Sequence, residues 1–241
     1  MEQSYAVEYR NLYENHWWWR SRESEILRNL DQFLNSDRAL KILDVGCGDG
    51  LFFEKLQRYG DVTGVESDVN TFSKESPWLS KIHNVPFNEK FQPGETFDVI
   101  LMLDILEHMP DPLSALRHAR TLLSPEGILL ATVPAFNALW TSHDVINHHV
   151  LRYRRETFHP LFEQSGLPIK KSKYLFHWTC PVKMAIRGKE WLLGAQPKPP
   201  SVPPTWLNKA CLALTRMENW LFSKVAMPFG SSLMVVGQRD G

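Results

Sequence analysis

The chain has 241 residues, 43% of them hydrophobic, which suits a single α/β domain with a full core. Lys and Arg together number 27 and so do Asp and Glu, so no strong positive charge draws the protein toward nucleic acid. Three cysteines at unrelated spacings fit neither a disulfide framework nor a zinc knot and indicate a reducing compartment.

The first 36 residues lack the basic start and apolar core of a signal peptide, and no apolar run in the chain approaches the ~20 residues of a membrane span. We therefore expect a cytoplasmic protein, with contact to a membrane surface left open. Residues 16–20 read His-Trp-Trp-Trp-Arg, and Ser21 is the expected N-cap of the helix that follows. The aromatic run either braces the start of this helix or forms a lid over a ligand, with Arg20 placed to pair a carboxylate.

A buried strand over residues 40–45 runs into a glycine-rich loop with glycines at Gly46, Gly48 and Gly50. Glycines allow unusual dihedrals and let a ligand approach the backbone closely. An amphipathic segment follows, for which we expect a helix ending at Gly60. The dinucleotide-binding fingerprint requires a sixth-position glycine, where this chain has Leu51, so that fingerprint fails.

The next strand, residues 62–66, ends in an acid, Glu66, at the position where a carboxylate can accept both hydroxyls of a ribose. Asp68 is the second candidate for that contact. A weak helix is expected over residues 69–80, and a short third strand with its loop over residues 81–87. Asn84, in that loop, can present its carbonyl oxygen to an amino group.

Residues 97–104 form an expected buried strand that ends at Asp104. A helix then begins at Pro112 with Asp111 as its N-cap, and a fifth strand covers residues 128–133. Repetition of strand, loop and helix predicts a parallel sheet with right-handed crossovers.

Residues 134–153 show no periodicity and follow the fifth strand, at the sheet edge where ligands of α/β proteins collect. A histidine oriented by a carboxylate can accept a proton near neutral pH. We predict His143 or His148 as a catalytic base and Asp144 as the residue that orients it. A purely structural hydrogen-bond network remains the alternative. The residues expected to contact the acceptor are Trp140, Arg152 and Tyr153.

A helix over residues 155–165 and a sixth strand over 170–178 follow, and the last strand is expected over 231–239. Between them, residues 179–229 form a helical insertion. Its second half carries an apolar stripe at helical spacing, which either packs in the core, walls an acceptor pocket or lies on a membrane. The stripe consists of Trp206, Leu207, Ala210, Cys211, Leu214, Met217, Leu221 and Val225, and Trp191 and Trp220 lie in the same insertion.

Two segments carry a family resemblance. The Asp44–Gly50 segment, with its Gly-x-Gly-x-Gly spacing, resembles the first motif of class I S-adenosylmethionine (SAM) dependent methyltransferases, and Leu106–Pro112 resembles the family's LEH-x-x-DP segment. The resemblance implies a doubly wound, mostly parallel α/β sheet of seven strands, in the order 3-2-1-4-5-7-6 with the seventh antiparallel. It also implies one domain over residues 1–241, with 1–36 as a cap and 179–229 as the insertion.

The resemblance further implies SAM as cofactor, S-adenosylhomocysteine as product, and methyl transfer to an oxygen of a small or lipid-linked acceptor. No metal is expected, although Asp104, Glu107 and His108 have spacing that could gather a cation. A non-catalytic SAM-binding protein and a nicotinamide-dependent oxidoreductase are the competing functions, and the oligomeric state is left open. The predicted cofactor contacts are Trp19, Arg20, Asp44, Gly46, Gly48, Gly50, Glu66, Asn84 and Asp104.

Overall fold

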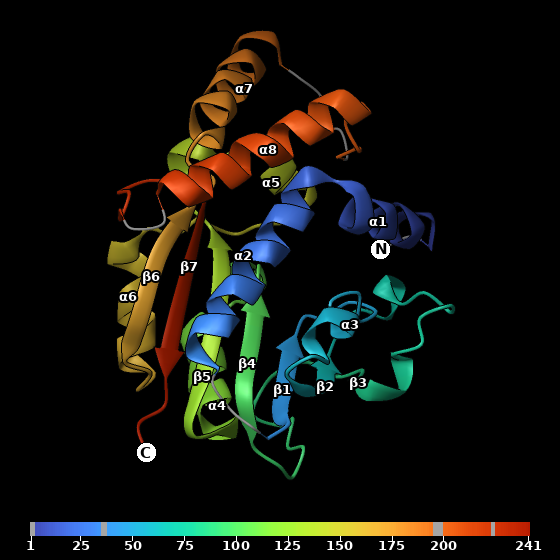
Figure 1. Cartoon of the computed structure of the whole chain (residues 1–241), viewed down its shortest axis with the longest axis vertical. Coiled ribbons are helices and arrows are strands. Elements are labelled where there is room, and N and C mark those ends of the chain that lie inside the picture. Colours follow the sequence, from blue (N-terminus) through green and yellow to red (C-terminus); the bar gives the residue numbers. More distant parts are fainter. Residues whose placement is uncertain (1–2, 35–37, 195–199, 223–224) are drawn as a thin grey trace.

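The computed structural model describes residues 3–34, 38–194, 200–222 and 225–241, and over these ranges it forms one seven-stranded sheet (Figure 1). The strand order is β3-β2-β1-β4-β5-β7-β6, and β7 runs antiparallel to both of its neighbours. The predicted order and the antiparallel last strand are therefore confirmed. The strands are β1 (Leu40–Val45), β2 (Gly60–Val65), β3 (Ile82–His83), β4 (Phe97–Leu103), β5 (Leu123–Pro134), β6 (Ile169–Leu175) and β7 (Ser232–Gln238).

Helices cover both faces of the sheet, as a doubly wound fold requires: α2 and α3 lie on one face, and α4 and α6 on the other (Figure 1). The helices α5, α7 and α8 gather beyond the carboxyl ends of the parallel strands. The α-helices are α1 (Gln3–Asn15), α2 (Trp17–Phe33), α3 (Phe53–Leu56), α4 (Pro112–Leu122), α5 (Ser142–Ile146), α6 (Arg155–Gln164), α7 (Thr179–Leu193) and α8 (Thr205–Leu221). The 3-10 turns are η1 (Val69–Thr71), η2 (Leu79–Lys81), η3 (Leu106–His108) and η4 (Asn137–Leu139).

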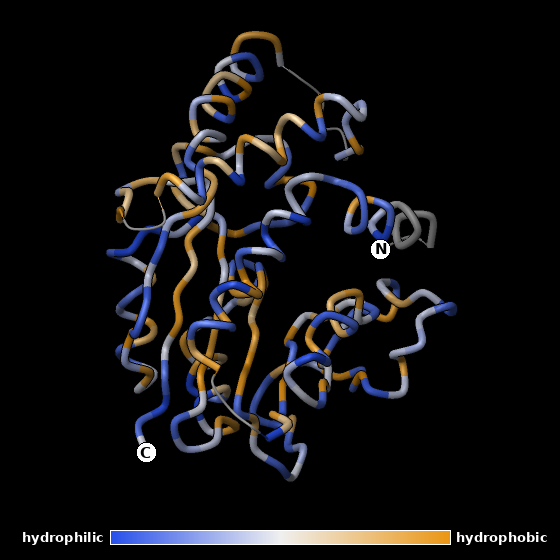
Figure 2. Tube along the Cα trace, viewed as in Figure 1, coloured by the Kyte–Doolittle hydropathy of each residue, from blue (hydrophilic) through white to orange (hydrophobic). Residues whose placement is uncertain are grey.

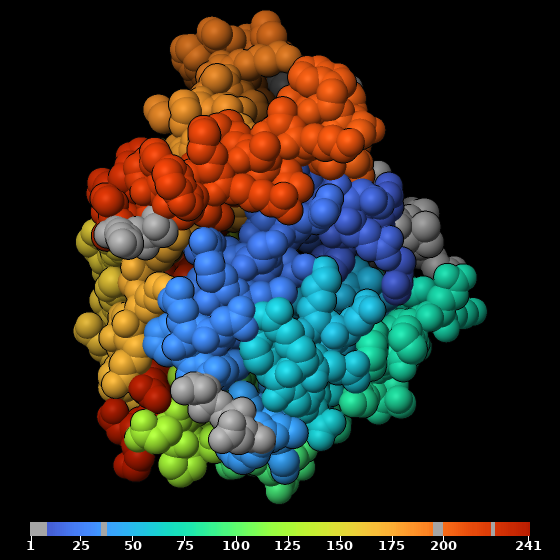
Figure 3. Space-filling model, in the orientation of Figure 1, coloured from blue at the N-terminus to red at the C-terminus, as the bar shows by residue number. Residues whose placement is uncertain are grey.

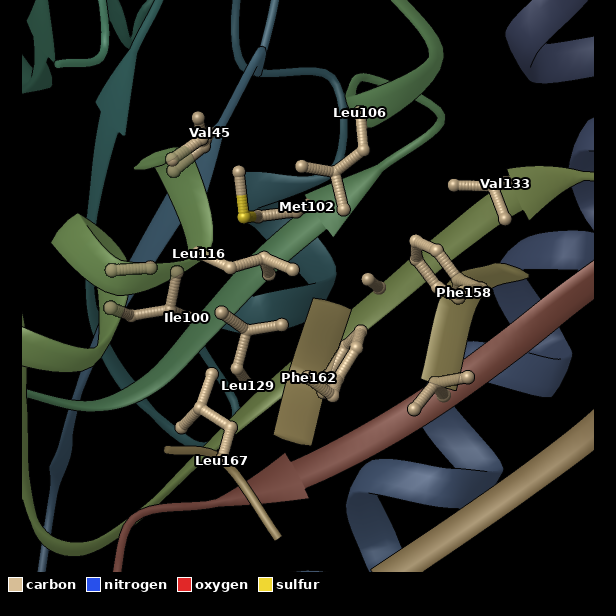
Figure 4. Close-up of a cluster of buried hydrophobic side chains, with 14 of the residues drawn as sticks. Val45, Ile100, Met102, Leu106, Leu116, Leu129, Val133, Phe158, Phe162 and Leu167 are labelled. Carbon is tan, nitrogen blue, oxygen red and sulfur yellow. The ribbon is translucent and has the colours of Figure 1, made fainter. Parts of the chain in front are cut away.

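Two apolar clusters hold these layers together. Figure 4 shows the cluster on the α4 and α6 face, where Phe158 lies beside Val133 of the sheet and Phe162 beside Leu129. The opposite face buries Ile26 and other apolar residues of α2 against β1 and β4. Because both faces are covered, the central strands are apolar almost continuously rather than in alternation.

The helix α2 begins at Trp17, five residues earlier than predicted, and Ser21 is buried inside it rather than capping it. Its N-cap is His16, whose ring nitrogen Nδ1 accepts a hydrogen bond of 3.1 Å from the backbone N–H of Trp18. The imidazole performs the capping task that Ser, Thr, Asp or Asn usually perform. The tryptophan run therefore forms the first turn of α2, and its side chains diverge around the helix.

Two other expectations were wrong. The segment after the glycine loop forms only the short α3, and Gly60 begins β2 instead of ending a helix. Residues 69–80 form the turns η1 and η2 rather than a helix. That segment is rich in Ser, Thr and Asn, whose side chains bond nearby backbone in competition with a helix, and Pro77 interrupts it.

We predict that Gly60→Ala destabilises the protein by about 3 kcal/mol or more. Gly60 has φ +155°, and a Cβ placed there would lie 2.0 Å from the backbone oxygen of Leu40 on the paired strand. The matched control is Gly188→Ala in α7, where an added Cβ meets nothing within 4 Å. Thermal unfolding should show the control unchanged or up to ~1 kcal/mol more stable, because alanine favours helix. Equal stability of both variants would contradict the close strand approach.

Asp44 is an acid buried inside the sheet, in β1. Burial raises the pKa of Asp44 from 3.8 to about 7; the charge of Arg22 opposes this shift and that of Glu66 adds to it. Between these two pH values the folded protein holds a proton that the unfolded chain has released. The free energy of unfolding contributed by this group therefore falls as the pH rises from about 4 to 7.

We predict that Asp44→Asn removes this decrease in the free energy of unfolding, because asparagine does not titrate. The variant should gain stability relative to the unsubstituted protein as the pH rises from about 4 to 7, by as much as ~4 kcal/mol, and no further above that range. Chemical denaturation at several pH values measures the difference. Asp61→Asn, at an exposed position of β2, is the control for removing an acid from the sheet. A difference between Asp44→Asn and the unsubstituted protein that is independent of pH would contradict the raised pKa.

Candidate active site

The strand order reverses between β1 and β4, which leaves a crevice at the carboxyl ends of these strands. The loop after β1 carries Gly46 at φ +74° and Gly50 at φ +82°, a left-handed conformation that favours glycine. A Cβ on Gly46 would lie 2.9 Å from Ile105 Cδ1, and one on Gly50 would lie 2.8 Å from Trp78 Cβ. Gly48 shares the conformation, with φ +55°, but has open space around it. The loop thus presents bare backbone to the crevice.

Glu66 lies directly after β2, beside this loop. Its Oε2 accepts a hydrogen bond of 3.1 Å from Gly48 N, and its Oε1 accepts one of 2.8 Å from Asp68 N. Asn84 donates from Nδ2 to the backbone oxygen of Glu66 at 2.8 Å. The structure therefore brings together Glu66, Asn84 and the glycine loop. The Asp68 carboxylate instead caps η1 by accepting from Asn70 N.

A pocket adjoins Glu66, and its walls are apolar apart from that carboxylate and Ser67. Such a lining suits a flat base with a hydroxylated sugar, because the base needs apolar contact and the sugar hydroxyls need an acceptor. The lining residues are Val45, Gly46, Val65, Glu66, Ser67, Val85, Phe87, Ile105 and Met109.

Arg22, which the sequence analysis did not select, lies at the other end of the crevice. Its Nε is 2.7 Å from Asp104 Oδ2, and Thr132 donates to Asp104 Oδ1 at 3.1 Å. Arg20, the predicted carboxylate partner, is exposed on the same helix. Residues 18 and 22 share a face only if the helix already includes Trp18, so a predicted helix start at Trp17 would have pointed to Arg22. In the structure the Arg22 guanidinium lies 5.5 Å from the Trp18 ring.

The tryptophan run joins separate parts of the chain. Trp17 lies 5.1 Å from the Trp178 ring, Trp18 stacks on Phe176 at 5.7 Å, and Trp19 meets Tyr9 of α1 edge to face at 6.1 Å. These contacts hold α1 and α2 against the segment after β6. The predicted contact of Trp19 with the cofactor remains a prediction.

Asp144 is the centre of the loop after β5, and its side chain is 0% exposed. Arg152 binds it with two hydrogen bonds, from Nε at 2.8 Å and from Nη2 at 2.9 Å. His149 Nδ1 lies 2.8 Å from Oδ1, and Thr141 N donates to Oδ2 at 2.9 Å. Burial would raise the pKa of Asp144, but the bonds from His149 and Arg152 outweigh burial and hold it below its ordinary value. Asp144 is therefore a carboxylate at neutral pH.

Asp144 orients His149, and neither of the two histidines predicted from the sequence pairs with it. His143 Nε2 lies 3.0 Å from Asn147 Nδ2, and burial lowers the pKa of His143 to about 4. His148 is exposed and adopts φ +55°. The left-handed residue turns the chain back so that His149, five positions after Asp144, reaches its carboxylate. No periodicity marks such a turn.

The expected acceptor contacts Arg152 and Tyr153 are buried and already engaged. Arg152 uses its remaining Nη1 on the backbone oxygen of Ala135 at 3.0 Å, in addition to its bonds to Asp144. The Tyr153 hydroxyl donates to Leu106 O at 3.3 Å, and its ring lies in the core. Both side chains therefore frame the loop, and their predicted contact with the acceptor stays a prediction. Trp140 is half-buried at the end of η4.

Within the described residues, Glu107, His108 and His149 have ligand atoms that all lie within 4.8 Å of one another. Such a trio could hold a divalent cation. It differs from the sequence-derived trio because Asp104 pairs with Arg22 instead. Burial raises the pKa of Glu107 well above its ordinary value, and the nearby Asp104 adds to the shift. The expectation of no metal stays a prediction.

Comparison with known proteins identifies the family. The pattern that defines the family described as "Methyltransferase domain" matches residues 18–171, more than half of the chain. A ubiquinone biosynthesis O-methyltransferase of Histophilus somni is 30% identical over 190 residues, which cover 69% of this chain and 78% of that protein. The enzyme of the same name from Actinobacillus pleuropneumoniae serotype 7 is 37% identical over 112 residues, 42% of this chain and 48% of its own.

Solved structures show the same fold at low identity. The N-methyltransferase NodS of Bradyrhizobium japonicum, solved with S-adenosylhomocysteine, superposes with a TM-score of 0.56 at 17% identity, covering 96% of this chain and 91% of NodS. The [4+2]-cyclase SpnF gives 0.56 at 16% identity over 90% of this chain and 80% of its own. The chain thus belongs to the methyltransferase-domain family and is a class I SAM-dependent methyltransferase.

Proposed function

We propose that this protein transfers the methyl group of SAM to an oxygen of a small or lipid-linked acceptor, with a lipid-linked one favoured. The observation that carries the proposal is the Asp144–His149 pair beside the crevice. A hydroxyl must lose its proton as it attacks a methyl group, and a histidine oriented by a carboxylate can take that proton. The relatives named for ubiquinone biosynthesis support this acceptor class, because they are O-methyltransferases and ubiquinone is itself a lipid.

The crevice residues fit the cofactor. Glu66 would hold the ribose hydroxyls and the apolar pocket beside it the adenine, with Asn84 at the edge of this pocket. The loop from Gly46 to Gly50 would leave room for the nucleoside against bare backbone. Asp44, which is buried at the end of β1 just before this loop, would support the loop from within the sheet. Trp19 would lie near the cofactor at the α1–α2 junction.

The opposite end of the cofactor carries an ammonium group and a carboxylate. Asp104 offers a carboxylate for the former, and Arg22 offers a guanidinium for the latter. Arg10, which pairs with Asp49 at 2.5 Å, is a second cation on this side. In this proposal Arg22 replaces Arg20.

When bound, SAM supplies an electrophilic methyl group and leaves as S-adenosylhomocysteine. His149 takes the acceptor proton on Nε2, because Nδ1 is committed to Asp144. The Asp144 carboxylate stabilises the imidazolium that results, and Arg152 keeps this carboxylate in place. Positioning of the acceptor supplies much of the remaining rate, since methyl transfer requires in-line alignment.

A non-catalytic SAM-binding role is the competing function, and SpnF illustrates that a protein of this fold can carry a different activity. The presence of an oriented histidine at the crevice favours catalysis. The partner in this proposal is a small-molecule or lipid-linked acceptor and not a nucleic acid. The protein would act in the cytoplasm or at the surface of the membrane that borders it.

We predict that Glu66→Gln weakens binding of S-adenosylhomocysteine by about 10- to 100-fold, because a charged hydrogen-bond acceptor is replaced by a neutral one. Calorimetric titration measures the affinity. The control is Glu54→Gln, an exposed acid on α3. Unchanged affinity for Glu66→Gln would remove the ribose contact from the proposal.

We predict that His149→Ala lowers methyl transfer by about 100-fold or more, the effect of losing a general base. Label transferred from SAM into a lipid extract measures the rate, and calorimetry with S-adenosylhomocysteine confirms that the cofactor site is intact. His143→Ala and His148→Ala are matched controls and should keep activity of the same order as the unsubstituted protein. Loss in His143→Ala with a normal rate in His149→Ala would reassign the base. Cofactor binding without any label transfer would favour the non-catalytic role.

A further inference from the structure

The two insertion helices face the protein with their polar sides. In α8, Glu218 accepts hydrogen bonds from His177 N at 3.0 Å and Trp178 N at 2.7 Å, and Thr215 accepts one from Trp178 Nε1 at 3.0 Å. Asn208 accepts from Trp17 N at 2.8 Å. A helix packed on a core buries its apolar stripe instead. The apolar stripe predicted in the sequence therefore points outward, which excludes core packing among the three alternatives for it.

The helix α7 follows the same rule. Its inward Glu190 accepts from Ser142 N at 3.1 Å and from Ser142 Oγ at 2.6 Å. Its exposed side chains are mostly apolar, with two bases among them, and in Figure 2 the end of α7 farthest from the sheet is hydrophobic. Figure 3 shows α8 on the outer surface and α7 projecting beyond the rest of the molecule.

We name the set of exposed apolar side chains on these two consecutive helices the α7–α8 outer face. Three of them are tryptophans, exposed by 84% (Trp191), 72% (Trp206) and 74% (Trp220). Exposed side chains of this size are costly in water, so several of them on two consecutive helices indicate an interaction surface. Tryptophan in particular favours the boundary between water and lipid. Leu192, Leu193 and Met217 complete the most exposed part of this face.

The sign of the exposed charges on α7 and α8 indicates a partner with negative charge. The exposed charged side chains of α7 and α8 are all basic, although acids and bases balance in the whole chain. The acids of these helices, Glu190 and Glu218, are used in the internal bonds above. On α8, Lys209 and Arg216 lie along one edge of the apolar face at helical spacing. The four exposed bases are Arg187, Lys189, Lys209 and Arg216.

We infer that the α7–α8 outer face docks on an anionic lipid bilayer, with its tryptophans at the headgroup boundary and its bases on lipid phosphates. A second copy of this chain is a poorer occupant, because two such faces would bring like charges together. Over the described residues no helix is long and apolar enough to cross a membrane, and the docking proposed here is peripheral.

Sedimentation with vesicles tests this inference without SAM or acceptor, so its outcome is independent of the proposed reaction. The full chain should sediment with phosphatidylglycerol–phosphatidylcholine vesicles and more weakly with phosphatidylcholine alone. The triple variant Trp191→Ser, Trp206→Ser, Trp220→Ser should bind about 100-fold or more weakly, because three large apolar side chains are lost. Lys209→Glu with Arg216→Glu should lower binding to the anionic vesicles by about tenfold or more.

The matched control is Lys74→Glu with Lys90→Glu, two exposed bases away from α7 and α8, which should bind as the unsubstituted protein does. Unchanged affinity for S-adenosylhomocysteine shows that each variant is folded, and Trp191→Ser alone provides a milder variant. An unsubstituted protein that stays in the supernatant, or a triple variant that sediments equally, would overturn the inference. A dimer in analytical ultracentrifugation that the triple variant abolishes, without vesicle binding, would assign the face to self-association instead.

Discussion

The reversal of strand order between β1 and β4 is the constraint on which the site depends. Val45 of β1 pairs with Val65 of β2 on one side and with Met102 of β4 on the other. The residues that follow each strand therefore reach the same level at one edge of the sheet. This register places Glu66 beside the glycine loop and Asp104 across from it. Helices diverge to opposite faces at such a point, so the edge between them stays open to a ligand.

The buried Asp144 cluster sets the other half of the site. Removing a carboxylate and a guanidinium from water is costly, and a buried pair offsets the cost only when its hydrogen bonds are complete. Arg152, His149 and Thr141 supply these bonds here. Because such a pair adds little net stability, its main consequence is geometric. It fixes the ring orientation of His149 and places Nε2 3.9 Å from Glu107 Oε1.

Local rules predicted the sheet well and the site in part. The apolar runs, the Asp111 cap and the glycine spacing each depend on neighbouring residues, and the fold followed from them. Arg22 escaped prediction because a histidine caps α2, which shifted the expected helix start. His149 escaped because one left-handed residue redirects an aperiodic loop. Periodicity revealed the stripe on α8, but it could not say which way the stripe faces, since that depends on what packs against the helix.

The insertion helices α7 and α8 contact both the α2 side of the site, which carries Arg22, and the loop after β5, which carries His149. Asn208 of α8 bonds Trp17 at the start of α2, the helix that carries Arg22. The helix α7 contacts the loop after β5: Glu190 accepts a hydrogen bond from Ser142, and Arg187 Nη1 donates to Asn137 O at 2.8 Å. Polar bonds thus fasten both helices to the site while their apolar sides face outward. An acceptor with a lipid tail would need its head at the crevice and its tail in an apolar phase. The α7–α8 outer face, docked on a bilayer, would satisfy both needs because the loop that holds His149 lies directly behind α7.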